Sequence, residues 1–186
     1  MDMDGNLEAL MAAYQAGDFA AARSLIDRLS PQLHRFLDAQ SRNPADADDL
    51  LQEAWLRIHR ARHTFRPGKP VLPWIYAIAR RVRVDHYRRQ VRTTAREERW
   101  EQLDDETTAS PPEAPRAEEL EALLAPLSAS QREVLEMLKV TGMSLEEVAR
   151  ATSSSVGSVK QKVHRAYEKL RQTTRLPQLR RSGGVQ

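Results

Sequence analysis

Cysteine is absent from the 186 residues of this chain. A disulfide framework, a thiolate metal site and a catalytic thiol are therefore excluded. Glycine is scarce, and neither a Gly-rich phosphate loop nor a nucleophile elbow is present. His59 and His63 lie one helical turn apart, but Arg60 stands where a zincin needs glutamate and no third ligand is evident. We therefore predict no enzyme, no metal and no cofactor.

Long apolar runs are also missing, since no stretch approaches the roughly 18 residues that span a membrane. The first five residues are acidic and lead into no apolar segment, which is unlike an export signal. We therefore expect a cytoplasmic protein without membrane insertion of its own.

Apolar residues recur at helical spacing along most of the chain, which predicts an all-α fold of two small domains. We place the domains at residues 1–92 and 117–176. Residues 93–116 are polar, acidic and proline-containing, which indicates a flexible linker, and residues 177–186 form a tail. The formal net charge is only +3, but its uneven distribution along the chain favours a polyanionic partner.

The first 62 residues are expected to form three helices. Two of them pair as a hairpin joined at Gly17 and Asp18, and Pro31 either starts a further helix or kinks the second. Asn43 is the expected cap of the next helix, which runs to about Arg62.

Leu56 lies on the polar arc of that helix, opposite its apolar residues. It shares this arc with Asp49, Gln52 and Glu53. Either Leu56 is an isolated exposed leucine, which is common, or this arc binds a partner.

A basic segment follows, in which Asp85 is the only acidic residue from Arg57 to Arg92. It contains a proline- and glycine-rich loop at residues 63–71, and aromatic residues are interspersed among the arginines. A basic surface with aromatic platforms is typical of proteins that bind unpaired nucleic acid. The alternative is that Trp74 and Tyr76 are core and the arginines are solvated.

Residues 144–167 have the pattern of a helix-turn-helix motif. Ser144 and Glu147 form a capping box, residues 152–154 make a short polar turn, and the next helix is apolar on one face. Its other face carries Ser158, Gln161, Lys162 and Arg165, which suit base edges and phosphates in a major groove. An ordinary amphipathic helix pair would also fit this segment.

Four motifs together resemble the bacterial RNA polymerase sigma factors of the sigma-70 family, in the small extracytoplasmic-function (ECF) subgroup. They are DADDLLQEAW (residues 46–55), PWIYAIAR (73–80), VDHYRR (84–89) and VGSVKQKVHRA (156–166). The resemblance implies an alternative sigma factor whose N-terminal domain reads and melts the promoter −10 element. Its C-terminal domain would read the −35 element. The sequence departs from the family pattern at Ser153 and Ser155, where Gly and Pro are frequent, and at Ala77, where Arg is frequent.

The resemblance also implies three sets of site residues. The −10 set is Thr64, Phe65, Arg66, Lys69, Trp74, Arg80, Arg81 and Arg88. The −35 set is Ser155, Ser158, Lys160, Gln161, Lys162 and Arg165. The polymerase-binding set is Asp49, Gln52, Glu53 and Leu56, which would dock on the clamp coiled coil.

The expected partners are core RNA polymerase, through its clamp coiled coil and its flap, promoter DNA and an anti-sigma factor. The protein would associate with the nucleoid in the holoenzyme, or be held at the membrane by the anti-sigma factor. The main alternative is a free-standing operator-binding regulator, which leaves the arginine- and aromatic-rich segment unexplained. A nucleic-acid-processing enzyme would need a site that the sequence does not offer.

Overall fold

The computed structural model describes residues 7–38, 46–97 and 124–180, and these are helices joined by short turns and loops, with no strand among them. The first domain contains α1 (Leu7–Gln15), α2 (Phe19–Asp38), α3 (Asp46–Ala61), a short 3₁₀ turn η2 (Arg62–Thr64) and α4 (Val71–Glu97). The second contains α6 (Ala129–Lys139), α7 (Leu145–Ala151) and α8 (Val156–Arg180). The predicted all-α fold with two helical domains is confirmed.

Helix α2 is the central element of the first domain, because it contacts α1, α3 and α4. Its hairpin with α1 turns at Gly17, which has a φ of +98°. The side chain of Asp18 then caps α2 by accepting hydrogen bonds from the N–H groups of Ala20 and Ala21. Helix α2 passes through Pro31 without ending, because it is fixed on both sides of the proline by buried apolar residues.

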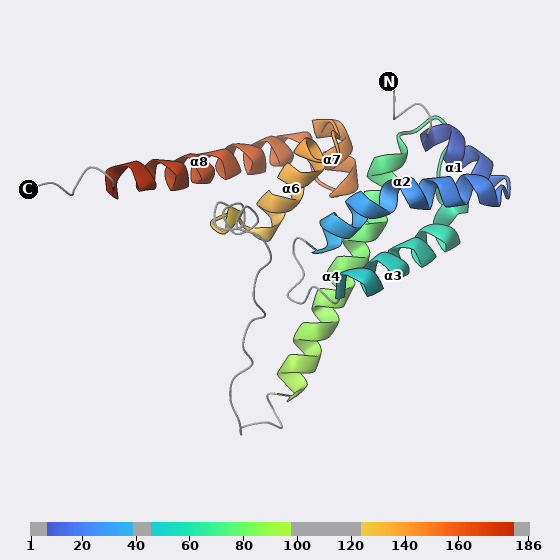
Figure 1. The fold of residues 1–186 in the computed structure, drawn as a ribbon, viewed down its shortest axis with the longest axis horizontal. Helices are drawn as coiled ribbons and strands as arrows, with labels where there is room; N and C mark the ends of the chain where they lie inside the picture. Colours follow the sequence, from blue (N-terminus) through green and yellow to red (C-terminus); the bar gives the residue numbers. More distant parts are fainter. Residues whose placement is uncertain (1–6, 39–45, 98–123, 181–186) are drawn as a thin grey trace, which may run out of the picture.

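The core of the first domain is formed by one face of each helix. It includes Met11, Leu25, Leu29, Leu33, Ile58, Ile75 and Val82. Trp55 joins α3 to α2, since its indole N–H donates to the Ser30 hydroxyl over 3.0 Å. This packing leaves the loop between α3 and α4 at the edge of the domain (Figure 1).

Helices α6 and α7 of the second domain start at capping boxes, as the sequence predicts for α7. The pairs Ser128 with Gln131 and Ser144 with Glu147 both make the two reciprocal hydrogen bonds of that motif. Gly142 follows α6 with a φ of +71°, which only glycine adopts without strain. Asn43, the cap expected for α3, lies outside the described residues, as does the start of the second domain expected at residue 117.

Two helices are longer than predicted. Helix α4 continues through Glu97, into residues assigned to the linker, and α8 continues through Arg180, into the expected tail. For α4 the reason is local: residues 93–97 contain neither proline nor glycine, so nothing stops the helix there.

The two domains touch. Helix α7 packs against α4, and the buried apolar cluster runs without a break from the first domain to Val134 and Met137 of α6. Helix α8 extends away from the first domain (Figure 1). None of the described helices is long and apolar enough to cross a membrane.

Candidate nucleic-acid interface

The loop between α3 and α4 is shaped by a tight turn at Pro67 and Gly68. Lys69 donates its N–H to the Arg66 carbonyl over 3.2 Å, and Gly68 has a φ of +77°. Proline followed by a residue with positive φ is the arrangement of a type II turn, which explains why glycine is needed here. The turn leaves Thr64, Arg66 and Lys69 exposed, so three residues of the predicted −10 set are available to a ligand.

Helix α1 holds this loop in place, a role that the sequence analysis missed. The amide of Gln15 donates to the backbone carbonyls of Arg62 (2.6 Å) and Phe65 (2.9 Å). At the other end of the loop, the Val71 N–H donates to the Glu8 carboxylate over 3.0 Å. These contacts join residues 47 to 63 positions apart, and no local pattern could have indicated them.

Phe65 of the predicted −10 set lies on the inner side of the loop. Its side chain is only 4 % exposed and packs edge-on against Trp74, with 5.6 Å between the ring centres. Phe65 therefore packs against Trp74 and supports the loop in this arrangement. Trp74 is half-buried, whereas Tyr76 is fully buried against Phe36. The alternative that Trp74 and Tyr76 are core is thus right for Tyr76.

Arg57 and Arg80 of the basic segment have carboxylate partners. Arg57 donates to Glu53 (2.7 Å) and Asp85 (2.8 Å), which raises the pKa of its guanidinium and lowers that of Asp85. Arg80 donates to Glu133 of the second domain over 3.0 Å. Arg81 and Arg88 of the −10 set are exposed on α4.

A pocket lies between the loop and α4. It is lined by Thr64, Phe65, Arg66, Lys69, Pro70, Pro73, Trp74, Ala77 and Arg150. Its size, about 380 Å³, falls within the usual range of ligand pockets. Most of its polar groups are cationic, which suits an anionic ligand with a flat apolar part.

The predicted polymerase-binding residues lie together on α3. Asp49 and Gln52 are exposed, Glu53 is half-buried beside Arg57, and Leu56 is 51 % exposed. Leu56 therefore lies on the polar side of the helix, as its position in the sequence predicts.

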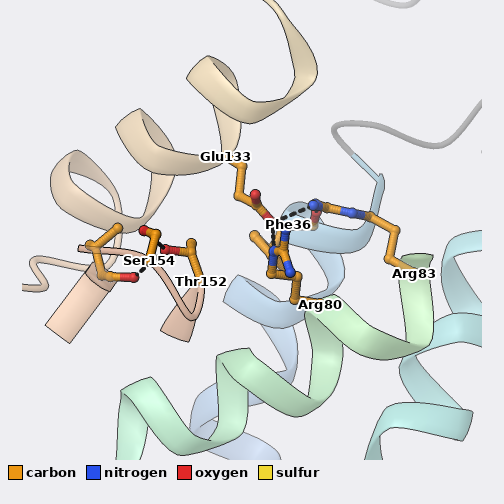
Figure 2. Close-up of polar contacts among 7 residues, drawn as sticks. Phe36, Arg80, Arg83, Glu133, Thr152 and Ser154 are labelled. Atoms are coloured by element: carbon orange, nitrogen blue, oxygen red, sulfur yellow. Dashed lines mark hydrogen bonds and ion pairs between the residues drawn. The ribbon is translucent and has the colours of Figure 1, made fainter. Parts of the chain in front are cut away.

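The helix-turn-helix in the second domain consists of α7, a turn and α8. Ser153 adopts a φ of +52°, and the Thr152 hydroxyl contacts the Ser154 hydroxyl at 2.8 Å, as Figure 2 shows. The Ser155 hydroxyl accepts the Ser158 N–H over 3.1 Å and so caps α8. Serine thus replaces the glycine and proline frequent in the family, and Ser155 has a structural task that its assignment to the −35 set did not include.

Helix α8 is fixed by its apolar face. Val159 and Ala166 are fully buried against the domain. Lys160, Gln161 and Arg165 are exposed, and Ser158 and Lys162 are half-buried. The described part of the chain thus carries two basic surfaces: one on an open recognition helix, the other on α4 and its loop.

Comparison with known proteins identifies what these two surfaces belong to. The family model of sigma-70 region 2 matches residues 25–93, and that of sigma-70 region 4 matches residues 117–170. The chain belongs to the sigma-70 family. Region 2 therefore contains most of α2, α3, the basic loop and most of α4, and region 4 contains the helix-turn-helix.

Relatives of similar length place this sigma factor in the ECF group. It is 33 % identical to the ECF RNA polymerase sigma factor SigF of Caulobacter vibrioides over 177 residues, which cover 94 % of this chain and 97 % of that protein. It is 34 % identical to SigD of Mycobacterium tuberculosis over 182 residues, which cover 92 % and 85 % of the two chains. The protein is accordingly a promoter-recognising transcription initiation factor.

A solved structure shows the same fold. The structure of CnrH in complex with the cytosolic domain of CnrY matches with a TM-score of 0.69 at 22 % identity, over 94 % of this chain and 99 % of that one. A second structure, sigma factor RpoE of Bartonella quintana in complex with the anti-sigma factor NepR, matches with a TM-score of 0.65 at 24 % identity, over 82 % and 96 % of the two chains.

Proposed function

We propose that the two domains of this sigma factor meet different forms of promoter DNA. Region 4 reads the −35 element as duplex, through the outward face of α8. Region 2 holds the −10 element as a melted strand, through the loop at residues 64–70 and the exposed arginines of α4. The observation that supports this division is the different construction of the two basic surfaces.

The face of α8 suits duplex because short polar and basic side chains project from one exposed helix, which can enter a major groove. Arg165 and Lys162 can meet guanine edges or phosphates there, and Gln161 can pair with adenine. The loop pocket is different, since Trp74 gives it a half-buried aromatic wall and Arg66 and Lys69 supply charge. A concave site of this kind suits one unstacked base and its phosphate.

The exposed arc of α3 is proposed as the surface that binds core polymerase, with Asp49, Gln52 and Glu53 around Leu56. Charged groups around a central apolar side chain are a common arrangement at protein interfaces. We also propose that an anti-sigma factor binds this chain, as NepR binds RpoE in the matching structure. Location at the membrane through such a partner is part of the same proposal.

Transcription in vitro with purified core polymerase and a promoter library tests the assignment. We expect core enzyme plus this chain to initiate at promoters that share a −35 and a −10 motif. Tight binding to duplex promoter DNA by the free protein, with no transcription in the presence of core enzyme, would contradict it.

A further inference from the structure

Glu133 of α6 is a carboxylate that is buried between the two domains. It is 3 % exposed, and its Oε1 atom accepts from Arg80 (3.0 Å) and Arg83 (2.5 Å) of α4, as Figure 2 shows. A buried carboxylate is costly unless it is paired, and both of its pairing partners belong to the other domain. The contact is therefore specific to the arrangement in which the domains touch.

Apolar packing surrounds this ion pair. The Arg83 side chain is 11 % exposed, its guanidinium lies 4.6 Å from the centre of the Phe36 ring, and it donates to the Phe36 carbonyl. Phe36 in turn packs against Tyr76, and both belong to the cluster that continues into α6. The interface thus combines a desolvated charge cluster with a continuous core.

The contact affects the two DNA surfaces unequally. Arg80 belongs to the −10 set and is occupied by Glu133, and α7 packs along the same helix, with Arg150 at the loop pocket. On α8, by contrast, Lys160, Gln161 and Arg165 remain exposed. The strand-binding surface is therefore covered in part, at Arg80 and beside the loop pocket, whereas the α8 face is not.

We propose that the Arg80–Arg83 surface of α4 is a shared anion site, which Glu133 occupies in the free chain and the phosphate backbone of the melted strand occupies after region 4 has moved away. The inference rests on the function proposed above for α4. Carboxylate and phosphate are both good partners for guanidinium groups, so the two compete for the same donors. The free sigma factor then binds single strands weakly, because only its open fraction is competent.

The absence of cysteine makes a direct test of opening simple. Cysteines introduced at two exposed positions, Arg28→Cys on α2 and Gln172→Cys on α8, accept spin labels without competing thiols. The distance between the labels is compared by pulsed electron paramagnetic resonance in the full chain and in Glu133→Gln and Arg83→Gln. The matched control is Glu146→Gln, an exposed glutamate of α7. We expect one narrow distance in the wild type and the control, and longer, broader distances in the two interface variants.

Binding to a fluorescent 15-nucleotide single strand of mixed sequence tests the competition. Glu133→Gln should bind about tenfold more tightly than the wild type if roughly a tenth of the wild type is open. Arg83→Gln also frees the surface but removes one guanidinium of the anion site, so its gain in affinity should be smaller than that of Glu133→Gln. Affinity for a duplex of the same composition should change little, since the α8 face is exposed in either state.

Three outcomes overturn the proposal. Unchanged label distances in both variants would show that the ion pair does not hold the domains together. Longer distances without tighter single-strand binding would show that Glu133 does not compete with DNA. In the Glu133→Gln background, a further Arg81→Ala change should weaken single-strand binding. If it has no effect, the assignment of α4 to the melted strand is itself wrong.

If Glu133→Gln fails to fold by circular dichroism, Arg83→Gln, which alters the other domain, decides the matter.

Discussion

Two leucines six positions apart on α3 have opposite environments. Leu50 is 3 % exposed in the core, whereas Leu56 is 51 % exposed among acidic and amide side chains. A leucine that is half exposed on such a surface contributes little to the fold, and the apolar area that it leaves uncovered is available to a partner.

Leu56→Asp is therefore expected to weaken binding to core polymerase by about 1 to 2 kcal/mol, roughly a five- to thirtyfold loss. The reason is that a charge would be buried at the centre of the proposed interface. Binding is measured by fluorescence anisotropy with labelled protein, and thermal unfolding is followed in parallel. Ile26→Asp is the control, because Ile26 is an exposed apolar residue on another helix, α2. Equal losses in both variants, or unfolding of Leu56→Asp, would contradict the prediction.

Sequence reasoning at the residue scale succeeds where the cause is local. A capping box depends on two residues three positions apart, and the outward position of Leu56 follows from the helical repeat. Both can therefore be predicted from neighbouring residues in the sequence. Phe65 shows the opposite case, because its burial depends on Trp74 closing over the loop. An aromatic residue in a basic segment looks the same in the sequence whether it faces DNA or the core.

At the scale of elements, α1 acts as a support for the basic loop. Gln15 and Glu8 lie at opposite ends of this short helix and hold the two ends of the loop, at Arg62, Phe65 and Val71. Fixing both ends lowers the entropy that the loop loses when a base enters its pocket. Helix α1 precedes the region 2 match, which starts at residue 25, so its contribution is easily overlooked.

Gln15→Ala should remove both hydrogen bonds to the loop carbonyls. We expect a loss of about 1 to 2 kcal/mol in the free energy of unfolding. Transcription should also discriminate less between intact and mutated −10 elements, because the loop is less ordered. Gln32→Ala, at a half-buried glutamine of α2, serves as the control. If discrimination is unchanged while stability falls, α1 supports the fold but not the reading of the promoter.

At the scale of the whole molecule, the sequence predicts the two domains but not their contact. The basic segment contains one acidic residue, so its arginines appear unpaired. Their partner Glu133 lies 50 positions from Arg83 on a helix of the other domain, where it resembles any surface glutamate. Only the three-dimensional arrangement shows that it is buried.

The same interface predicts a dependence on pH. Burial raises the pKa of Glu136 from 4.5 to about 7, and nearby Glu133 adds to this effect, while Arg83 and Arg35 oppose it. Tyr76 is the other titratable group that faces it, from α4. Because the pKa of Glu136 is raised in the closed arrangement, closing is most favourable below pH 4.5, where the carboxyl is protonated in either arrangement. This contribution to closing is lost as the pH rises toward about 7. The spin-label distance should therefore lengthen over that range.

Glu136→Gln keeps the side chain neutral at every pH, so its label distance should change less between pH 4.5 and 7 than that of the wild type. Glu146→Gln should follow the wild-type profile. A Glu136→Gln profile that parallels the wild type would exclude Glu136 as the titrating group.

The division of labour between the domains can be tested by comparing two exposed arginines. Arg165 is on the outward face of α8, and Arg81 is on α4. Arg165→Ala should cost about 1 to 3 kcal/mol in binding to the closed promoter if the residue reads a base, and less, with a smaller salt dependence, if it meets only phosphate. Arg81→Ala should mainly reduce strand opening, because its proposed partner is the unpaired strand.

A template that is already melted at the −10 element separates the two roles. It should restore transcription by Arg81→Ala, because part of the free energy of opening no longer has to come from the protein. It should not restore Arg165→Ala, whose defect precedes melting. Permanganate footprinting on duplex and premelted templates measures opening, and run-off transcription measures activity. Equal rescue of both variants, or rescue of neither, would mean that the two basic surfaces do not meet different forms of DNA.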